Sequence, residues 1–256
     1  MSAFDKEVAL RVAENGLNAS LIDAAQQFLL ASTKPKYCYN FSWQGRPIIQ
    51  YPQDIVGMQE LIWSVKPDLV IETGIAHGGS LIFTASMLAL LDYCDAVEQN
   101  ATLDPAVPRR RVLGIDIDIR THNRAAIEAH PMFHRIDMIE GSSIAPDVVR
   151  KVQDISANYS RIMVCLDSNH THEHVLAELE AYAPLTSVGS YCVVFDTIID
   201  DFPADTYPDR PWGPGNNPKT ALRDYLKRHS GFTIDAEMDN KLLITVAPSG
   251  FLRRNY

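Results

Sequence analysis

Short apolar runs alternate along this chain with stretches whose apolar residues recur at helical spacing. Five of the runs have the length and composition of β-strands, and they cover residues 68–72, 111–116, 134–139, 161–167 and 190–196. Parallel strands need a long crossover between them, so the alternation predicts an α/β fold with a mostly parallel, Rossmann-like sheet between two layers of helices. Ligands of such sheets bind at the carboxyl ends of the strands, where we expect the functional residues.

Two more strand-like runs follow, over residues 231–236 and 241–246, with a short turn between them. They predict a C-terminal antiparallel hairpin, which brings the sheet to seven strands. A hairpin after five alternating units is more typical of class I methyltransferases than of dehydrogenases, which is an analogy between folds. We predict that residues 67–256 form this domain. Residues 1–66 would form an N-terminal helical region with a substrate or oligomerisation segment, which is irregular over residues 33–53.

The charge balance is acidic, with 23 Lys and Arg against 32 Asp and Glu and a formal net charge of -9. Such a chain is not attracted to nucleic acid phosphates or to anionic lipid, so the expected partner is a small molecule. We find neither a leader peptide nor an apolar run of the ~20 residues that a membrane span needs, and we expect a cytoplasmic location. The four cysteines show no CxxC spacing, so neither disulfides nor a thiolate zinc site is expected.

A glycine-rich turn and a predicted helix follow the first strand. Residues 71–80 read Ile-Glu-Thr-Gly-Ile-Ala-His-Gly-Gly-Ser, in which the small residues of interest are Gly74, Gly78, Gly79 and Ser80. Glycines let the backbone approach a ligand closely, and the amino end of the helix offers free N–H groups. The spacing is not GxGxxG, and Glu72 would repel a pyrophosphate but would hold the ammonium of a methionine moiety. The turn therefore favours S-adenosylmethionine over NAD; the alternative is a tight turn without a ligand.

The second and third strands also end in polar residues. Asp116 closes the second strand and places a carboxylate where the ribose diol of a nucleotide would lie. Ser142 follows the third strand, and we predict that it borders the adenine ring. Structural roles stay open nearby, because Asp118 would serve as a helix N-cap and Ser143 would cap the helix that follows.

Two carboxylates close the fourth and fifth strands. Asp167 and Asp196 are both predicted at the ligand-binding edge of the sheet. The ends of neighbouring strands lie ~4.8 Å apart, which lets two carboxylates share one hard ion that prefers oxygen ligands. We predict a shared Mg²⁺. In the alternative, one carboxylate caps a helix and the other is solvated.

A histidine three residues after Asp167 is predicted to reach the same pocket. The neutral imidazole of this residue, His170, would remove the proton of an alcohol whose acidity a metal has raised, and the alkoxide would attack a sulfonium methyl. This chemistry predicts a hydroxylated small-molecule acceptor. His174 lies one helical turn further on the same face and is either a second functional histidine or a packing residue.

At these residues the sequence resembles the cephalosporin hydroxylase family, whose fold and cofactor site are those of a methyltransferase. The resemblance runs from about Tyr39 to the C-terminus. The segments that carry it are 40–43, 45–47, 72–74, 78–80, 167–170 with His174, and 212–215. It implies S-adenosylmethionine held by the glycine-rich turn and Asp116, a metal held partly by Asp167 and Asp196, and a homo-oligomer. The sequence is also similar to macrolide sugar O-methyltransferases, in which a histidine at the position of His170 is the base.

One position departs from the family pattern. Characterised relatives have a Glu-Asp pair after the fifth strand, whereas this chain has Phe195 before Asp196. Water, Asp200 or Asp201 would complete the metal shell, or the metal is weakly bound or absent.

Two other functions remain open. Asp167, His170 and His174 make the two-histidine, one-carboxylate set of a non-haem-iron hydroxylase. The missing glutamate favours a catalytically inactive protein that binds S-adenosylmethionine. The glycine-rich turn and Asp116 favour our main hypothesis, an S-adenosylmethionine-dependent, Mg²⁺-assisted O-methyltransferase that acts on a sugar or another natural product.

Overall fold

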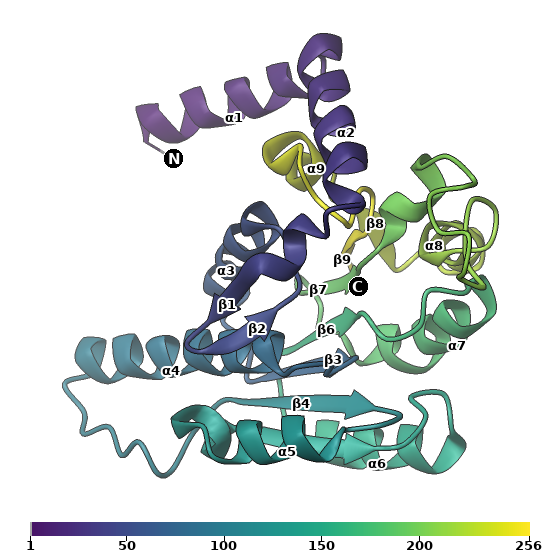
Figure 1. The fold of residues 1–256 in the computed structure, drawn as a ribbon. Coiled ribbons are helices and arrows are strands. Elements are labelled where there is room, and N and C mark those ends of the chain that lie inside the picture. Colours follow the sequence, from purple (N-terminus) through teal and green to yellow (C-terminus); the bar gives the residue numbers. More distant parts are fainter. Residues whose placement is uncertain (1) are drawn as a thin grey trace.

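A seven-stranded sheet forms the centre of the computed structural model, which describes residues 2–256 (Figure 1). The strand order is β5-β4-β3-β6-β7-β9-β8, and the neighbours from β5 to β7 are parallel. The parallel strands are β3 (Leu69–Thr73), β4 (Arg111–Asp116), β5 (Ile136–Glu140), β6 (Ile162–Leu166) and β7 (Tyr191–Val194). Each predicted run overlaps one of these strands, so the α/β prediction is confirmed.

The strand order reverses beside β3. The chain proceeds outward from β3 to β4 and β5, then returns to place β6 and β7 on the other side of β3. Such a reversal opens a crevice at the carboxyl ends of the two central strands, where ligands of doubly wound sheets bind. The turn after β3 and the loop after β6 therefore form the walls of the expected site.

The C-terminal hairpin is only partly as predicted. β8 (Phe232–Ile234) lies in the first predicted run, but its antiparallel partner β9 is Phe251–Arg254, well beyond the second predicted run. Residues 241–246 instead continue from helix α9 (Ala236–Leu242), whose first turn is capped by the side chain of Asp235. The second run was wrongly assigned because periodicity does not distinguish a short apolar strand from a turn of buried helix.

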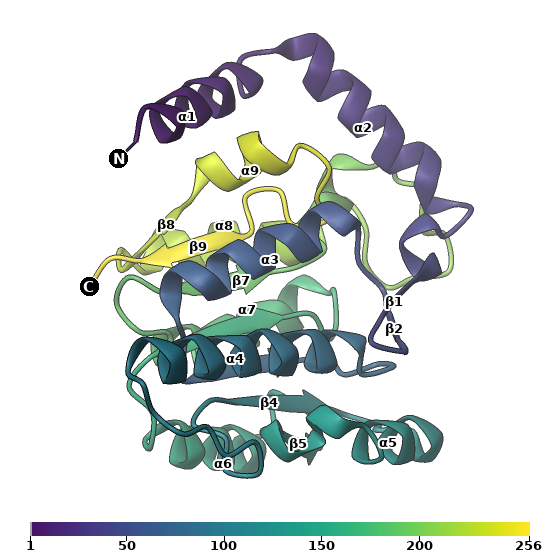
Figure 2. The same ribbon diagram turned by 90° about the vertical axis from the view of Figure 1, so that its left-hand side faces the viewer.

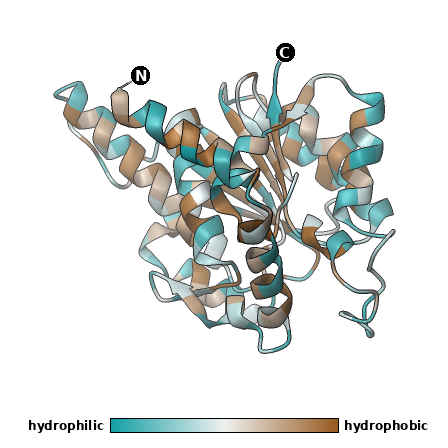
Figure 3. Cartoon of the chain, turned by 90° about the horizontal axis from the view of Figure 1, so that it is seen from above, coloured by the Kyte–Doolittle hydropathy of each residue, from teal (hydrophilic) through white to brown (hydrophobic). Residues whose placement is uncertain are grey.

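Helices cover both faces of the sheet. Alternate strand residues point to opposite faces, and this divides the core into two apolar clusters. One face packs against α3 (Pro52–Val65), α4 (Gly79–Glu98), α5 (Thr121–Glu128) and α9, and the other against α6 (Pro146–Ser156), α7 (His172–Tyr182) and α8 (Pro218–Arg228). In Figure 3 the hydrophobic residues gather on the strands and on the helix sides that face them.

Helix α4 is the most apolar long helix of the fold. By length and composition alone it is long and apolar enough to cross a membrane, although no such segment was expected from the sequence. However, 56% of its most apolar 18-residue window is buried inside the molecule. Burial of that kind is what a core helix beside a central sheet requires.

The N-terminal region holds two helices and a small hairpin. Helix α1 (Ala3–Asn15) buries none of its residues and lies near α9, and α2 (Ala19–Thr33) runs along the outside of the molecule (Figure 2). Residues 33–53 were predicted as irregular, but they contain the antiparallel strands β1 (Phe41–Trp43) and β2 (Arg46–Ile48). That prediction was wrong in this part.

The hairpin turn consists of Gln44 and Gly45, which both have positive φ, at 44° and 84°. Such a two-residue turn matches the twist of the flanking strands. Its usual sequence signal is Asn-Gly rather than Gln-Gly, so the hairpin was not predicted from the sequence. The Arg46 side chain donates to the backbone oxygen of His77 at 3.0 Å. The hairpin is thereby fixed over the glycine-rich turn.

Candidate active site

The glycine-rich turn needs its glycines for two physical reasons. Gly74 has a φ of +90°, and a Cβ there would lie 2.1 Å from the backbone oxygen of Asp167. Gly78 has a φ of +82° and is the N-cap residue of α4, and a Cβ on Gly79 would lie 2.1 Å from the backbone oxygen of Pro47. The turn, the backbone at Asp167 and the backbone at Pro47 therefore lie in close contact, and a side chain at Gly74 or Gly79 would clash with its neighbour.

Glu72 lies beneath the turn and is buried. Its carboxylate accepts a hydrogen bond from the Thr84 hydroxyl on α4. Burial raises the pKa of Glu72, although hydrogen bonds from Thr84 and Ser80 favour the charged form. A buried carboxylate of this kind needs a cationic partner, and an ammonium group would be one.

Asp116 has a structural task that the sequence did not reveal. Its Oδ2 accepts from the backbone N–H of Ile75 at 2.7 Å and of Ala76 at 3.2 Å, and its Oδ1 accepts from Asp118 N–H at 3.1 Å. The carboxylate thus joins the end of β4 to the glycine-rich turn. The N-cap alternative for Asp118 is wrong, because α5 begins after Arg120.

Ser142 lies where predicted, at the carboxyl end of β5 beside the end of β4. The preceding residue, Gly141, donates its N–H to the backbone oxygen of Asp116 at 2.8 Å. Ser142 is half-buried at this edge of the sheet. The three loops after β3, β4 and β5 therefore lie in a row along the same edge.

His174 belongs to a separate polar network on α7. Its Nε2 lies 3.0 Å from the Ser143 hydroxyl and 3.3 Å from the Ser168 hydroxyl, which donates to Glu178 at 2.6 Å. Glu178 is fully buried. Ser143 therefore bonds to a histidine rather than capping α6, and His174 connects the loop after β5 to the loop after β6. His172 turns toward Thr220 on α8 instead.

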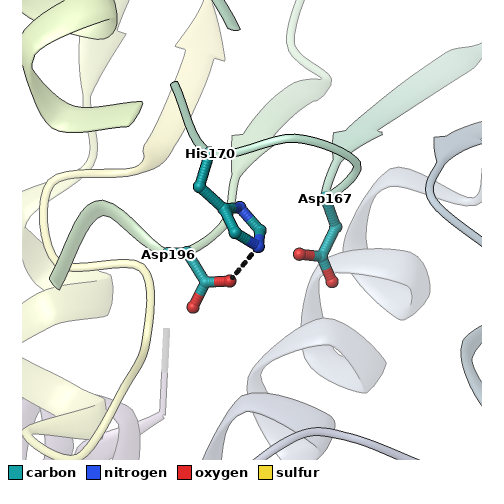
Figure 4. Close-up of side chains that lie close together, drawn as sticks. All are labelled: Asp167, His170 and Asp196. Atoms are coloured by element: carbon teal, nitrogen blue, oxygen red, sulfur yellow. Dashed lines mark ion pairs between the residues drawn. The ribbon is translucent and has the colours of Figure 1, made fainter. Parts of the chain in front are cut away.

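Asp167, His170 and Asp196 converge at the ends of β6 and β7 (Figure 4). One ligand atom from each lies within 4.8 Å of the other two, and His170 Nε2 is 3.1 Å from Asp196 Oδ2. Burial raises the pKa of Asp167 well above its usual range, and the negative charges of Asp196 and Glu72 raise it further. The cluster combines two oxygen ligands and one nitrogen ligand, and His174 is not part of it.

Phe195 is buried and lines a pocket beside this cluster. The two acids considered as replacements for the absent glutamate are already paired, because Asp200 lies 2.7 Å from Arg223 and Asp201 forms an ion pair with Lys219. Neither carboxylate is therefore free to complete a metal shell, which leaves water in the place of the glutamate, or a metal that is weakly bound or absent.

The pocket of about 330 Å³ lies between the glycine-rich turn and the acidic cluster. It is lined by Gln50, Met58, Glu72, Thr73, Gly74, Ser80, Phe83, Thr84, Cys165, Asp167 and Phe195. Gln50 and Gly74 also line a second pocket. Gln50, Phe83 and Thr84 were not predicted from the sequence, because only the fold brings them to this place.

The doubly wound sheet, its antiparallel C-terminal strand and the glycine-rich turn beside β6 define a class I methyltransferase. The model of the family described as "Rhamnosyl O-methyltransferase/CmcI" matches residues 35–255. The chain belongs to this family.

Individual relatives agree with this membership. A rhamnosyl O-methyltransferase of Mycobacterium tuberculosis is 32% identical over 208 residues, which cover 79% of this chain and 73% of the relative. Its counterpart in Mycobacterium leprae is 29% identical over 215 residues, which cover 83% and 82%. Among solved structures, CmcI with Mg and SAM has a TM-score of 0.55 at 17% identity and covers 85% of this chain and 78% of its own.

These findings confirm three predictions made from the sequence. The resemblance to the cephalosporin hydroxylase and sugar O-methyltransferase group is confirmed, as is the class I methyltransferase fold. The chain is an S-adenosylmethionine-dependent O-methyltransferase. The roles of individual site residues, the division at residue 66 and the homo-oligomer remain predictions.

Proposed function

We propose that the enzyme methylates a sugar hydroxyl, with Mg²⁺ held by Asp167 and Asp196 and with His170 as the general base. The observation that carries this proposal is the convergence of these three side chains within 4.8 Å of one another. The loop that contains Asp167 also packs directly against Gly74 of the glycine-rich turn. A methyl donor in that turn would therefore lie next to the acid–base cluster, as methyl transfer requires.

S-Adenosylmethionine would be held along the edge formed by the loops after β3, β4 and β5. Glu72 offers a buried carboxylate to the methionine ammonium, and the turn with Gly78 and Gly79 offers the N–H groups at the start of α4. Asp116 is the proposed ribose acceptor, and its bonds to the turn mean that it also holds the turn in shape. Ser142 is the proposed neighbour of the adenine.

The acidic cluster fits a divalent cation. Among residues 2–256 no donor hydrogen-bonds to the side chain of Asp167, and that carboxylate faces the like charge of Asp196. Burial and the neighbouring charge raise the pKa of Asp167, and a cation between the two carboxylates would favour the charged form of that group. Oxygen ligands with water in the remaining positions are the usual environment of Mg²⁺. The ion would supply charge that lowers the pKa of the acceptor hydroxyl.

His170 would accept the proton of the acceptor hydroxyl. Its Nε2 faces the two carboxylates, and the pair with Asp196 fixes the orientation of the ring. With Asp196 bound to a metal, Nε2 would be released from this pair and would then take the hydroxyl proton as the acceptor oxygen bonds to the methyl carbon and the carbon–sulfur bonding pair returns to sulfur. The products are a methyl ether and S-adenosylhomocysteine, with one proton left on the imidazole.

The proposed acceptor is a sugar because relatives that match most of the chain are named rhamnosyl O-methyltransferases. The iron hydroxylase alternative loses support, since His174 pairs with Glu178 and lies outside the cluster. The N-terminal region takes part in our proposal as a substrate segment, because the β1–β2 hairpin covers the glycine-rich turn. We also propose that the enzyme forms a homo-oligomer, since exposed apolar side chains such as Leu10 and Leu17 lie on and beside α1.

Two measurements test the proposal. Calorimetry should detect S-adenosylmethionine binding that Glu72→Ala and Asp116→Ala weaken severely, and wild-type affinity in both variants would refute the assignment. Methyl transfer to methyl α-L-rhamnopyranoside should fall about 10²–10⁴-fold in kcat in His170→Ala, the usual contribution of a general base. His172→Ala is the matched control, because His172 lies two residues away but contacts α8. Cofactor binding without product from any rhamnoside would favour the inactive, binding-only alternative.

A further inference from the structure

Two aromatic rings in the segments around the acidic cluster each carry a cation. The edge of the Trp212 ring meets His170, with 4.8 Å between ring centroids and 88° between planes. The Arg210 guanidinium lies 5.1 Å from the centroid of the same indole. Arg210 is therefore stacked on a ring that itself contacts the proposed base.

A second cation approaches from the N-terminal region. Lys36 Nζ lies 5.6 Å from the centroid of the Tyr39 ring, which is 52% exposed. Burial raises the pKa of Tyr39, the charge of Asp196 raises it further, and the charge of Arg210 lowers it. Tyr39 thus lies within electrostatic reach of both Asp196 and Arg210.

The segments that carry these residues lie side by side. Figures 1 and 2 both place the end of α2 and the residues after it beside the loop that follows η4 (Thr197–Asp201). Leu29 and Cys38 from the first segment pack with Phe202 and Tyr207 from the second. Lys36 and Arg210 therefore belong to one rim around the site.

Neither cation makes an ion pair within residues 2–256, although nearby cations do. Arg223 and Lys219 on α8 are paired with Asp200 and Asp201. Lys36 and Arg210 are exposed, and each lies over an aromatic ring. In an acidic chain, two unpaired cations held in place beside a catalytic cluster leave positive charge available to a ligand.

We propose that this rim binds a phosphoryl group, and that the acceptor is a phosphate-bearing sugar whose reacting hydroxyl reaches His170. The stacked, planar guanidinium of Arg210 would form a two-pronged contact with phosphate oxygens, and Lys36 would add a point charge. Trp212 and Tyr39 would offer apolar faces to the sugar ring. This subsite rests on the proposed sugar O-methylation and names the chemical class of its acceptor.

The test compares two rhamnosides that differ in charge. L-Rhamnose 1-phosphate and methyl α-L-rhamnopyranoside are titrated by calorimetry into the protein loaded with S-adenosylhomocysteine and Mg²⁺. The phosphate should bind at least about tenfold more tightly, since hydrogen bonds to charged groups contribute about that much, and the advantage should shrink as salt screens it. Equal affinity for the two compounds at low salt, or no binding of either, overturns the proposal.

Two variants locate the effect. Arg210→Ala and Lys36→Asn should each remove most of the advantage of the phosphate without changing the affinity for the neutral rhamnoside. Asn suits position 36 because the backbone φ there is +55°. Arg150→Ala, which removes an exposed cation on α6, is the control and should change neither affinity. Equal weakening of both ligands by Arg210→Ala would make Arg210 a packing residue and contradict the subsite.

Further experiments distinguish which phosphate compound binds, and they distinguish failure of the phosphate subsite from failure of the proposed methyl transfer. Thymidine diphosphate L-rhamnose and inorganic phosphate are titrated in the same way. Tighter binding of L-rhamnose 1-phosphate or of the nucleotide sugar than of inorganic phosphate supports the subsite. The same samples are assayed for methyl transfer. If the phosphate advantage depends on Arg210 but no methyl ether forms, the proposed function fails while the subsite stands.

Discussion

A buried aspartate on α3 should contribute strongly to the way the stability of the enzyme depends on pH. Asp54 is fully buried, and its Oδ2 accepts from the backbone N–H of Val246 at 3.1 Å. The oxygen of Val246 in turn accepts from Ile198 N–H at 3.2 Å, two residues after Asp196. Asp54 is therefore linked through Val246 to the backbone that follows Asp196.

Burial raises the pKa of Asp54 to about 7, and the charge of Asp196 contributes in the same direction. In the unfolded chain an aspartate ionises near pH 3.9. Between these two values the folded protein binds a proton that the unfolded chain has lost, so the free energy of unfolding falls as the pH rises from about 4 to about 7. The full difference corresponds to about 4 kcal/mol, which is an upper estimate for this one group.

Asp54→Asn removes the charge and keeps a side-chain oxygen for the Val246 N–H. Urea unfolding of both proteins from pH 4.5 to 8.5 should therefore show the variant gaining on the wild type as the pH rises, by up to about 4 kcal/mol. Asp23→Asn, at an exposed position on α2, is the control and should follow the wild type. Parallel curves for the wild type and Asp54→Asn would refute the reasoning.

Three further predictions concern the site. Gly74→Ala should abolish measurable S-adenosylmethionine binding by calorimetry while the protein stays folded by circular dichroism, because the new Cβ would lie 2.1 Å from the backbone of Asp167; retained affinity would show that the turn is not the cofactor site. His174→Ala should weaken S-adenosylmethionine about fivefold, the value of one lost hydrogen bond, and His174→Gln should restore part of the affinity; a loss in kcat alone would contradict this positioning role. Asp196→Asn should weaken Mn²⁺ binding, measured by electron paramagnetic resonance, more than tenfold while S-adenosylmethionine affinity holds, and unchanged Mn²⁺ affinity would exclude Asp196 as a ligand.

The sequence was most informative where local pattern and global fold agree. The runs that became β3, β4, β6 and β7 are buried on both faces, so their apolar composition marks them directly. Because parallel strands end at one edge, the same pattern also predicted that Asp167 and Asp196 would meet. Figure 4 places them together, with the His170 ring between the two carboxylates.

The sequence was least informative where long-range packing decides. Leu242 and Leu243 have the composition of a strand, but the helix that begins after the Asp235 cap extends to Leu242, and Leu243 has a φ of +58°. Gln50 lines both pockets only because the β1–β2 hairpin is folded back over the turn. The bonds from Asp116 to the turn likewise join residues 40 and 41 positions apart, which no local pattern records.

The central claim is that the cluster of Asp167, His170 and Asp196 binds a divalent ion that assists methyl transfer to a sugar hydroxyl. The most direct test measures initial rates of methyl transfer to a rhamnoside in the wild type and in Asp196→Asn, first in chelator and then after Mg²⁺ is added back. We expect chelator to suppress the wild-type rate and Mg²⁺ to restore it, and we expect no such restoration in the variant. Full wild-type activity in chelator would contradict the account.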